Sequence, residues 1–173
     1  MTQGLMPRNL QTIPGKAIMR IIFTLLALLL LPLAAVAQDF GRLVAQVALQ
    51  PLPEAETPDI DLLLRTQWKA YYNAGGPHGF FRDQVRAGRI DLNEDGRAEL
   101  FILIDSPAWV SAKGQPLLVA GWTSRGWAPI GWSFADSDSV FVTSERIDGW
   151  ATIQTPTQAL QRVGKGYQAI DRR

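Results

Sequence analysis

Residues 91–104 of this chain read DLNEDGRAELFILI, an acidic loop that runs directly into five consecutive apolar residues. Those five residues have no polar face to offer solvent, so they predict the central strand of a sheet that is covered on both sides. In the loop, Asp91, Asn93 and Asp95 carry side-chain oxygens at alternate positions, and Gly96 permits a sharp bend. This pattern predicts a turn that binds a hard cation such as calcium.

The loop is shorter than a complete EF-hand. Counted from Asp91, the ninth position is Glu99, but the twelfth, where an EF-hand has a bidentate glutamate, is Ile102. The predicted ligands of the smaller calcium site are therefore the side chains of Asp91, Asn93, Asp95 and Glu99 and the carbonyl group of Arg97. The missing ligand predicts a weak Kd of ~10⁻⁴ to 10⁻³ M and a structural role. An alternative stays open, because Asn, Asp and Gly also form turns that bind no ion.

Short runs rich in Val, Ile, Phe and Trp, separated by glycine-containing turns, continue from Phe80 to the C-terminus. This spacing is typical of an antiparallel sheet. The predicted strands are 84–90, 99–105, 116–122, 127–133, 140–144, 150–155, 159–163 and 167–171. Hairpin turns are predicted at 123–126, 146–149 and 164–166, where a glycine can adopt a positive φ.

The part of the chain before residue 80 shows helical spacing instead. Apolar residues within 40–47 predict a short amphipathic helix, with a strand as the alternative. Residues 51–58 hold three prolines and predict a linker. A longer helix is predicted from Asp59, which favours a helix N-terminus, to Asn73, just before a glycine pair. The predicted fold class is therefore α+β: an N-terminal helix or helices packed on a mostly antiparallel, twisted β-sheet.

The N-terminal segment has the layout of a secretory signal peptide. Basic residues precede an apolar run, Ile21–Ala37, which ends in the small residues Ala35-Val36-Ala37. The run is shorter than the ~20 residues of a membrane span and contains Pro32, so a membrane anchor is the weaker alternative. We expect cleavage after Ala37 and export to the periplasm or the extracellular space, with translation starting at Met1 or Met19.

The predicted domain organisation is a signal peptide at 1–37, a short helix and linker at 38–58, and an α+β domain at 59–173. The leader carries three of the 17 Lys and Arg residues and none of the 16 acidic residues, so the remaining chain is net acidic. That balance argues against nucleic acid as a partner. The chain has no cysteine, which excludes disulfides, thiolate metal sites and thiol nucleophiles.

Two further features can be weighed. His78 is the only histidine, and no nucleophile motif accompanies it, so a solvated loop histidine is favoured over a catalytic or metal-binding role. Trp122, Trp127 and Trp132 surround one predicted hairpin. A five-residue step changes face in a strand, so only some of these rings are expected to share a surface. They can form a partner surface or pack the sheet against the helix.

The loop of residues 91–96 resembles the Asp-x-Asp/Asn-x-Asp-Gly calcium loops of FG-GAP and VCBS-type β repeats. The region from Phe80 to Tyr167 is also similar to small, uncharacterised periplasmic proteins that carry one such loop, a following apolar strand and a Gly-Trp pair like Gly149-Trp150. The resemblance implies a structural calcium ion and a β-rich exported domain. A single copy of the loop argues against a propeller, which needs several blades.

These observations predict an exported protein that is not an enzyme and serves as a binding or accessory module of the cell envelope. Its expected partner is an envelope protein or a glycan, with no membrane association after cleavage, and it is expected to be a monomer. Two alternatives remain: an inhibitor or adaptor that acts through the aromatic hairpin, and a hydrolase whose acids the sequence does not single out.

Overall fold

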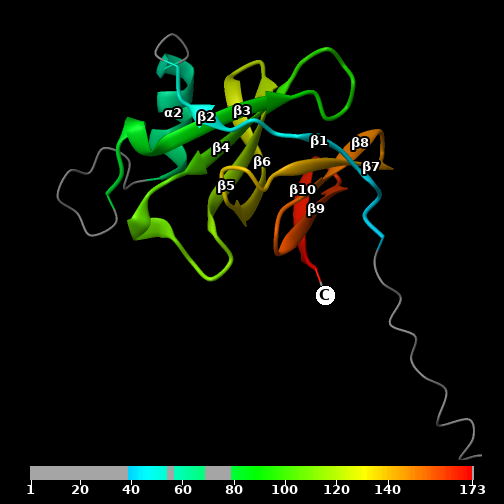
Figure 1. Cartoon of the computed structure of the whole chain (residues 1–173). Coiled ribbons are helices and arrows are strands. Elements are labelled where there is room, and N and C mark those ends of the chain that lie inside the picture. Colours follow the sequence, from blue (N-terminus) through cyan, green and yellow to red (C-terminus); the bar gives the residue numbers. More distant parts are fainter. Residues whose placement is uncertain (1–38, 54–56, 69–78, 173) are drawn as a thin grey trace, which may run out of the picture. The chain divides into compact units, whose positions relative to one another are not determined.

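The computed structural model describes residues 39–53, 57–68 and 79–172 (Figure 1). The chain separates into two units, Met1–Ala37 and Gln38–Arg173, and every described residue belongs to the second. The predicted leader, His78 and the C-terminal end of the predicted 59–73 helix lie outside the described residues. Within the described part of the chain, no helix has the length and apolar character needed to cross a membrane.

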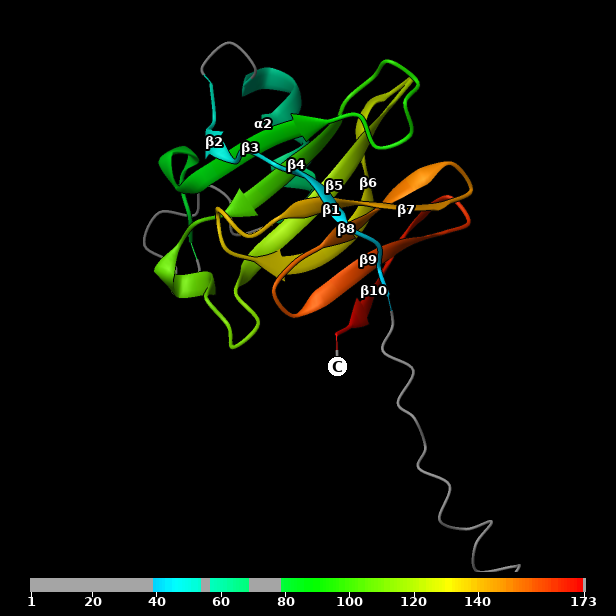
Figure 2. The same ribbon diagram turned by 45° about the vertical axis from the view of Figure 1, so that its right-hand side comes forward.

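The described residues form two antiparallel five-stranded sheets (Figure 2). The first, here the β4 sheet, has the order β2-β3-β4-β5-β6. Its strands are β2 (Gln50–Pro51), β3 (Val85–Ile90), β4 (Glu99–Ile104), β5 (Gln115–Thr123) and β6 (Gly126–Ala135). The second, here the β8 sheet, has the order β1-β7-β8-β9-β10. Its strands are β1 (Leu43–Gln46), β7 (Phe141–Ile147), β8 (Trp150–Gln154), β9 (Gln158–Val163) and β10 (Gly166–Asp171).

One α-helix is present in the described residues, α2 (Thr57–Gln67), with two short 3-10 helices, η2 (Arg82–Gln84) and η3 (Pro107–Trp109). Helix α2 starts two residues before the predicted Asp59, which lies in its first turn. It packs against the β4 sheet and not between the sheets (Figure 1). A helix of this length is stabilised mainly by that packing, because short isolated helices are marginal in water.

The predicted α+β class is wrong. All eight strands predicted beyond Phe80 are present, but they divide between two sheets, and the predicted N-terminal helix within 40–47 is a strand. Strand β1 pairs with β7, where Gln46 lies opposite Phe141, and the Val47 N–H donates to the Val140 carbonyl at 2.9 Å. The strand alternative applies here because β7 offers backbone partners that the local apolar spacing does not reveal.

Strand β4 is buried at all six positions, which confirms the predicted central strand. Its side chains alternate between two cores. Phe101 and Leu103 belong to the core between the two sheets, whereas Leu100, Ile102 and Ile104 belong to the core beneath α2. One strand therefore organises both layers of packing, as its uninterrupted apolar sequence requires.

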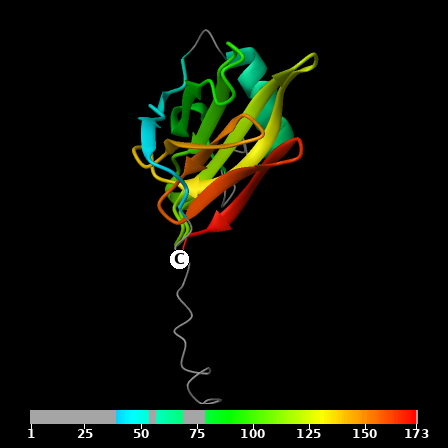
Figure 3. The same ribbon diagram turned by 90° about the vertical axis from the view of Figure 1, so that its right-hand side faces the viewer.

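The two sheets are joined along both edges. On one side, β1 and β2 follow each other in a single short segment, so the chain passes from the β8 sheet to the β4 sheet there. On the other side, β10 runs beside β6 (Figure 3). A Cβ atom on Gly131 would lie 2.8 Å from the Tyr167 Cβ, so only glycine allows this close approach.

Candidate functional site

The loop between β3 and β4 is organised around the Asp91 carboxylate. It accepts hydrogen bonds from the backbone N–H groups of Asn93 and Asp95, both at 3.3 Å, and of Gly96 at 2.8 Å. Desolvation opposes ionisation of Asp91, but the surrounding N–H groups outweigh it and hold its pKa below the ordinary value. Gly96 adopts a left-handed backbone conformation (φ 84°), which explains why a glycine stands at this position. Glu94 also adopts a left-handed conformation (φ 61°).

Leu92 anchors this loop to the opposite sheet. Its side chain is fully buried in the core between the sheets, and its carbonyl oxygen accepts hydrogen bonds from the Ala151 N–H and from Nη1 of Arg146, both at 2.8 Å. Arg146 also forms an ion pair with Glu94. Because these bonds come from β7 and β8, the loop is attached to both sheets.

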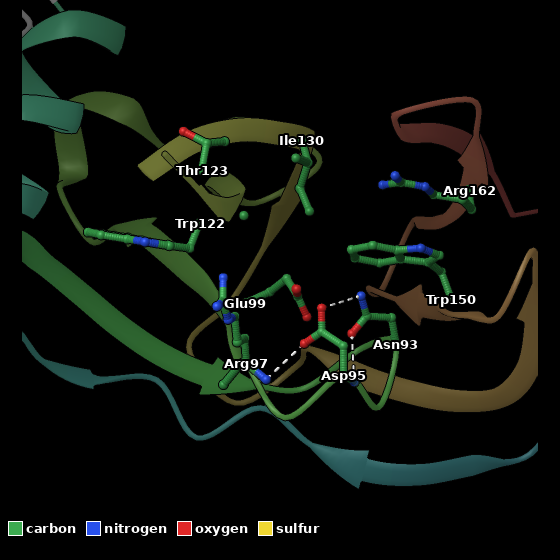
Figure 4. A pocket seen from close by; sticks show the side chains of 11 residues that line it. Asn93, Asp95, Arg97, Glu99, Trp122, Thr123, Ile130, Trp150 and Arg162 are labelled. Atoms are coloured by element: carbon green, nitrogen blue, oxygen red, sulfur yellow. Dashed lines mark hydrogen bonds between the residues drawn. The ribbon is translucent and has the colours of Figure 1, made fainter. Parts of the chain in front are cut away.

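Glu99, the first residue of β4, is 5% exposed, and its Oε2 atom accepts a hydrogen bond from the Leu92 N–H at 2.8 Å. Burial raises the pKa of Glu99, and the nearby charges of Asp95 and Asp91 raise it further. Figure 4 shows the side chains of Asn93, Asp95 and Glu99 directed toward one another. These three oxygen-bearing groups therefore converge at the base of the loop.

The predicted metal ligands differ in the hydrogen bonds that they already make within the loop. Asn93 and Asp95 are linked by a side-chain hydrogen bond of 3.0 Å, and Asp95 also accepts from the Arg97 N–H at 2.8 Å. Asp91 is engaged with the N–H groups of its own loop. In the described residues, no group of three or more His, Cys, Asp or Glu side chains has an arrangement that could hold a metal ion. The converging carboxylate and amide oxygens nevertheless fit the chemistry of a hard cation.

A cavity of about 220 Å³ opens beside these oxygens, between the loop, the β5–β6 hairpin and the β8 sheet (Figure 4). This volume is below the ~300–1,000 Å³ of sites for drug-sized ligands, so the cavity suits a small ligand. Its lining residues are Asn93, Asp95, Arg97, Ala98, Glu99, Gly121, Trp122, Thr123, Ile130, Trp150 and Arg162. The acidic loop thus forms one wall of a pocket whose other walls come from both sheets.

The wall that the β8 sheet contributes is aromatic and cationic. The Arg162 guanidinium stacks over the Trp150 ring, 4.0 Å from its centroid, and lies 5.8 Å from the centroid of Tyr167. Trp150 and Tyr167 meet edge to face, with centroids 6.1 Å apart, and the Tyr167 hydroxyl donates to the Ala151 carbonyl at 2.8 Å. Sequence reasoning did not assign Trp150 or Arg162 to a site, because no motif connects either residue with the loop.

The hairpin tryptophans have a different arrangement from the one predicted. Val119 pairs with Gly131 and Ala120 with Pro129, so β6 has a bulge at Ile130. The extra residue shifts the alternation of side chains in β6 by one position, so that two tryptophans five residues apart point to the same face of the sheet. Trp127 and Trp132 both lie on the helix side of the β4 sheet. The expectation that a five-residue step separates their faces is therefore wrong.

These rings do not form one row. The ring centroids of Trp122 and Trp127 are 5.1 Å apart, and the guanidinium carbon of Arg89 lies 4.8 Å from the centroid of the Trp127 ring. Trp132 packs instead on Trp68, with centroids 5.0 Å apart. Trp122 lines the pocket, but Figure 4 shows its ring directed away from the acidic side chains. The side chains of Asn93, Asp95 and Glu99 therefore line the pocket and not the aromatic surface of the hairpin.

No family model, curated protein or solved structure matches this chain. The resemblance to FG-GAP and VCBS-type calcium loops therefore stays a prediction that rests on residues 91–99. The same holds for export, calcium binding and partners.

Proposed function

We propose that this protein is an exported, non-enzymatic binding module of the cell envelope in which residues 91–99 form a calcium-supported loop beside a small-ligand pocket. The observation that carries the proposal is the convergence of Asn93, Asp95 and Glu99 on that pocket. Asn93, Asp95 and Glu99 would hold the ion directly, and Asp91 would order the loop around it. The ligand of the pocket is a small glycan or a group on an envelope protein.

The electrostatics of the loop support a cation. Asp91, Asp95 and Glu99 lie close enough for the first two charges to raise the pKa of the third. A divalent cation would supply positive charge at the point where these groups repel one another, and would favour the ionised form of Glu99. Because Leu92 already fixes the loop to β8, calcium would tighten an existing turn and would not be needed to fold it.

Two alternatives fit less well. An adaptor surface on the hairpin would need exposed, adjacent rings, but Trp132 packs on Trp68 and Arg89 covers Trp127. A hydrolase is favoured by one observation, since Asp95 and Glu99 line the same pocket and the pKa of Glu99 is raised. However, Glu99 is 5% exposed and already accepts the Leu92 N–H, so a substrate would reach it poorly. Binding is the better supported function.

The calcium loop is tested by thermal unfolding of residues 38–173 after treatment with a chelator. With a Kd near 10⁻³ M, 10 mM calcium should stabilise the protein by about 1.4 kcal/mol. That gain should raise the Tm by roughly 3–5 °C for a domain of this size. Asp95→Asn should abolish most of the rise, because it removes a charged ligand.

Glu94→Gln is the matched control. It removes one negative charge from the same loop, but Glu94 is exposed and paired with Arg146, and it does not line the pocket. The Glu94→Gln variant should keep the full calcium response. A wild-type Tm that does not change at 10 mM calcium, or an equal loss of response in both variants, would contradict the proposal.

A further inference from the structure

Arg162 differs from the other described arginines in the combination of two features, a buried nitrogen without an acceptor and no side-chain hydrogen bond or ion pair. Arg42, Arg97 and Arg125 also lack such bonds to described residues but are exposed. Arg82 has a buried Nε without an acceptor but donates through Nη2 to the Leu52 carbonyl. Arg86 is paired with Asp105 and Arg146 with Glu94, and Arg172 donates to the Thr155 carbonyl. By contrast, the Arg162 side chain has no hydrogen bond or ion pair to any residue within 39–53, 57–68 and 79–172, and its Nη1 atom is buried without an acceptor. A buried guanidinium N–H that lacks an acceptor is costly, and such groups call for an explanation.

The position of Arg162 beside the pocket is a second observation, separate from the buried Nη1 atom. The guanidinium carbon of Arg162 lies over the Trp150 ring, 4.0 Å from the centroid, and a contact of this kind does not use the N–H groups of the guanidinium as hydrogen-bond donors. Arg162 lines the same cavity as Asn93, Asp95 and Glu99, and in Figure 4 the Trp150 ring lies between Arg162 and Asn93. A planar guanidinium fork matches an oxyanion, which it binds through two parallel hydrogen bonds.

The pocket therefore has two unlike ends. At one end Arg162 offers N–H donors and positive charge, and a second arginine, Arg97, lines the pocket from the acidic loop. At the other end Asp95 and Asn93 offer oxygens, which accept hydrogen bonds from hydroxyl groups and can share a cation with them. A ligand that satisfies both ends needs an oxyanion and several hydroxyl groups within the size of one sugar ring, given the cavity of about 220 Å³.

We propose that the pocket binds an acidic sugar, with Arg162 holding the carboxylate or phosphate group and the loop of residues 91–99 contacting the hydroxyl groups. This assignment rests on the proposed binding function of the same pocket and names the ligand class. Trp150 acts as a positioning residue, because it fixes the plane and direction of the Arg162 guanidinium. The ligand hydroxyl groups would lie beside Asp95, where they donate to its carboxylate.

The test is an NMR titration of residues 38–173 in calcium with D-glucuronate, glucose 6-phosphate and D-glucose as probes, following the Trp150 indole N–H. We expect saturable shifts with at least one of the two acidic sugars and an affinity for D-glucose that is lower by about tenfold or more, the usual effect of a lost charge-assisted hydrogen bond. The two acidic probes distinguish a carboxylate from a phosphate ligand. Saturation by neither acidic sugar at tens of millimolar would overturn the proposal.

Arg162→Gln should lower the affinity for the preferred acidic sugar to that for D-glucose. Arg162→Lys should fall between them, because it keeps the charge but loses the planar fork. Arg125→Gln is the matched control: it removes one positive charge from the exposed β5–β6 turn, outside the pocket lining, and should bind like the wild type. Equal affinities of the Arg162→Gln variant and the wild type would overturn the role of Arg162.

The titration also separates this inference from the calcium proposal. Acidic-sugar binding that depends on Arg162 but is unchanged by chelator, in a protein without a calcium-dependent Tm, would leave the sugar site standing and remove the calcium loop. A calcium-dependent Tm without acidic-sugar binding would leave the loop standing and remove the sugar site.

Discussion

At the scale of single residues, Glu99 shows what the loop pattern could and could not predict. Counting from Asp91 placed Glu99 at the ninth position of a calcium loop, and it does lie beside Asp95 and Asn93. Its burial and its bond to the Leu92 N–H depend on how the loop turns back against β4. Trp150 and Arg162 were not predictable as site residues, because long-range strand pairing brings them to the loop.

Glu99 also gives the loop a defined pH dependence when calcium is absent. Its folded-state pKa is raised, so folding favours the protonated form. The stabilising contribution is fully present below the unfolded pKa of about 4.5 and is lost as the pH rises through the folded pKa. Glu99→Gln should remove this loss, since its amide keeps the acceptor for the Leu92 N–H.

Urea denaturation of both proteins in chelator, from pH 4.5 to pH 8, measures this effect. The free energy of unfolding of the Glu99→Gln variant, relative to the wild type, should increase as the pH rises. Subtracting the two curves cancels the other carboxyl groups, including Asp91, whose lowered pKa acts in the opposite direction. A difference that does not vary with pH would contradict a raised pKa of Glu99.

At the scale of elements, the strands were predictable and their partners were not. Alternating or continuous apolar runs between glycine turns predict strands β3 to β10 to within a few residues. The bulge at Ile130 has no such pattern, because it depends on register with β5. That single extra residue turns Trp132 toward α2, where it packs on Trp68. Strand β1 was misassigned for a similar reason, since its partner β7 lies far away in the sequence.

The contact between Trp132 and Trp68 predicts that β6 holds the C-terminal end of α2. Trp68 is 6% exposed and also contacts Phe80 edge to face at 6.1 Å. Trp132→Ala should destabilise the protein by about 2 kcal/mol, below the usual 3–5 kcal/mol for a fully buried ring, because Trp132 is 42% exposed. The amides of α2 should also exchange hydrogen faster, because local packing controls local opening.

Trp122→Ala is the comparison for this experiment. Trp122 is 47% exposed and has one edge-to-face tryptophan partner, Trp127, but that pair lies on the hairpin. Its removal should leave hydrogen exchange in α2 at the wild-type rate. Equal acceleration in both variants would mean that Trp132 does not hold the helix.

At the scale of the whole molecule, the sequence correctly predicted a high strand content and a central strand covered on both faces. It predicted one sheet, whereas the described residues form two. A run that is apolar on both faces needs a cover on each side, and either a helix or a second sheet can provide one. Here β4 has one of each, α2 on one face and the β8 sheet on the other. The helical cover was predicted for one face, whereas the second sheet arises from pairings such as β1 with β7.

The proposed export predicts a defined mature protein. Cleavage after Ala37 would leave Gln38 as the first residue, and this cut would remove none of the described residues, since these begin at Asp39. The intact mass of protein recovered from a secreting host should match residues 38–173. Ala35→Arg should block processing, because signal cleavage needs small residues at this position. Recovery of the full-length wild-type chain would contradict the prediction.

The pairing of β1 with β7 has a consequence for how the chain reaches its native state. Leu43 lies opposite Thr143, so the edge strand of the β8 sheet forms between segments about a hundred positions apart. Closing so long a loop costs entropy before the new backbone bonds compensate for it, and topologies of this kind fold slowly. Strand β1 cannot pair until β7 has been synthesised, so β1 stays without its partner on the nascent chain. Slow closure of this pair would fit the proposed export, because a chain must stay extended to pass through a translocation channel.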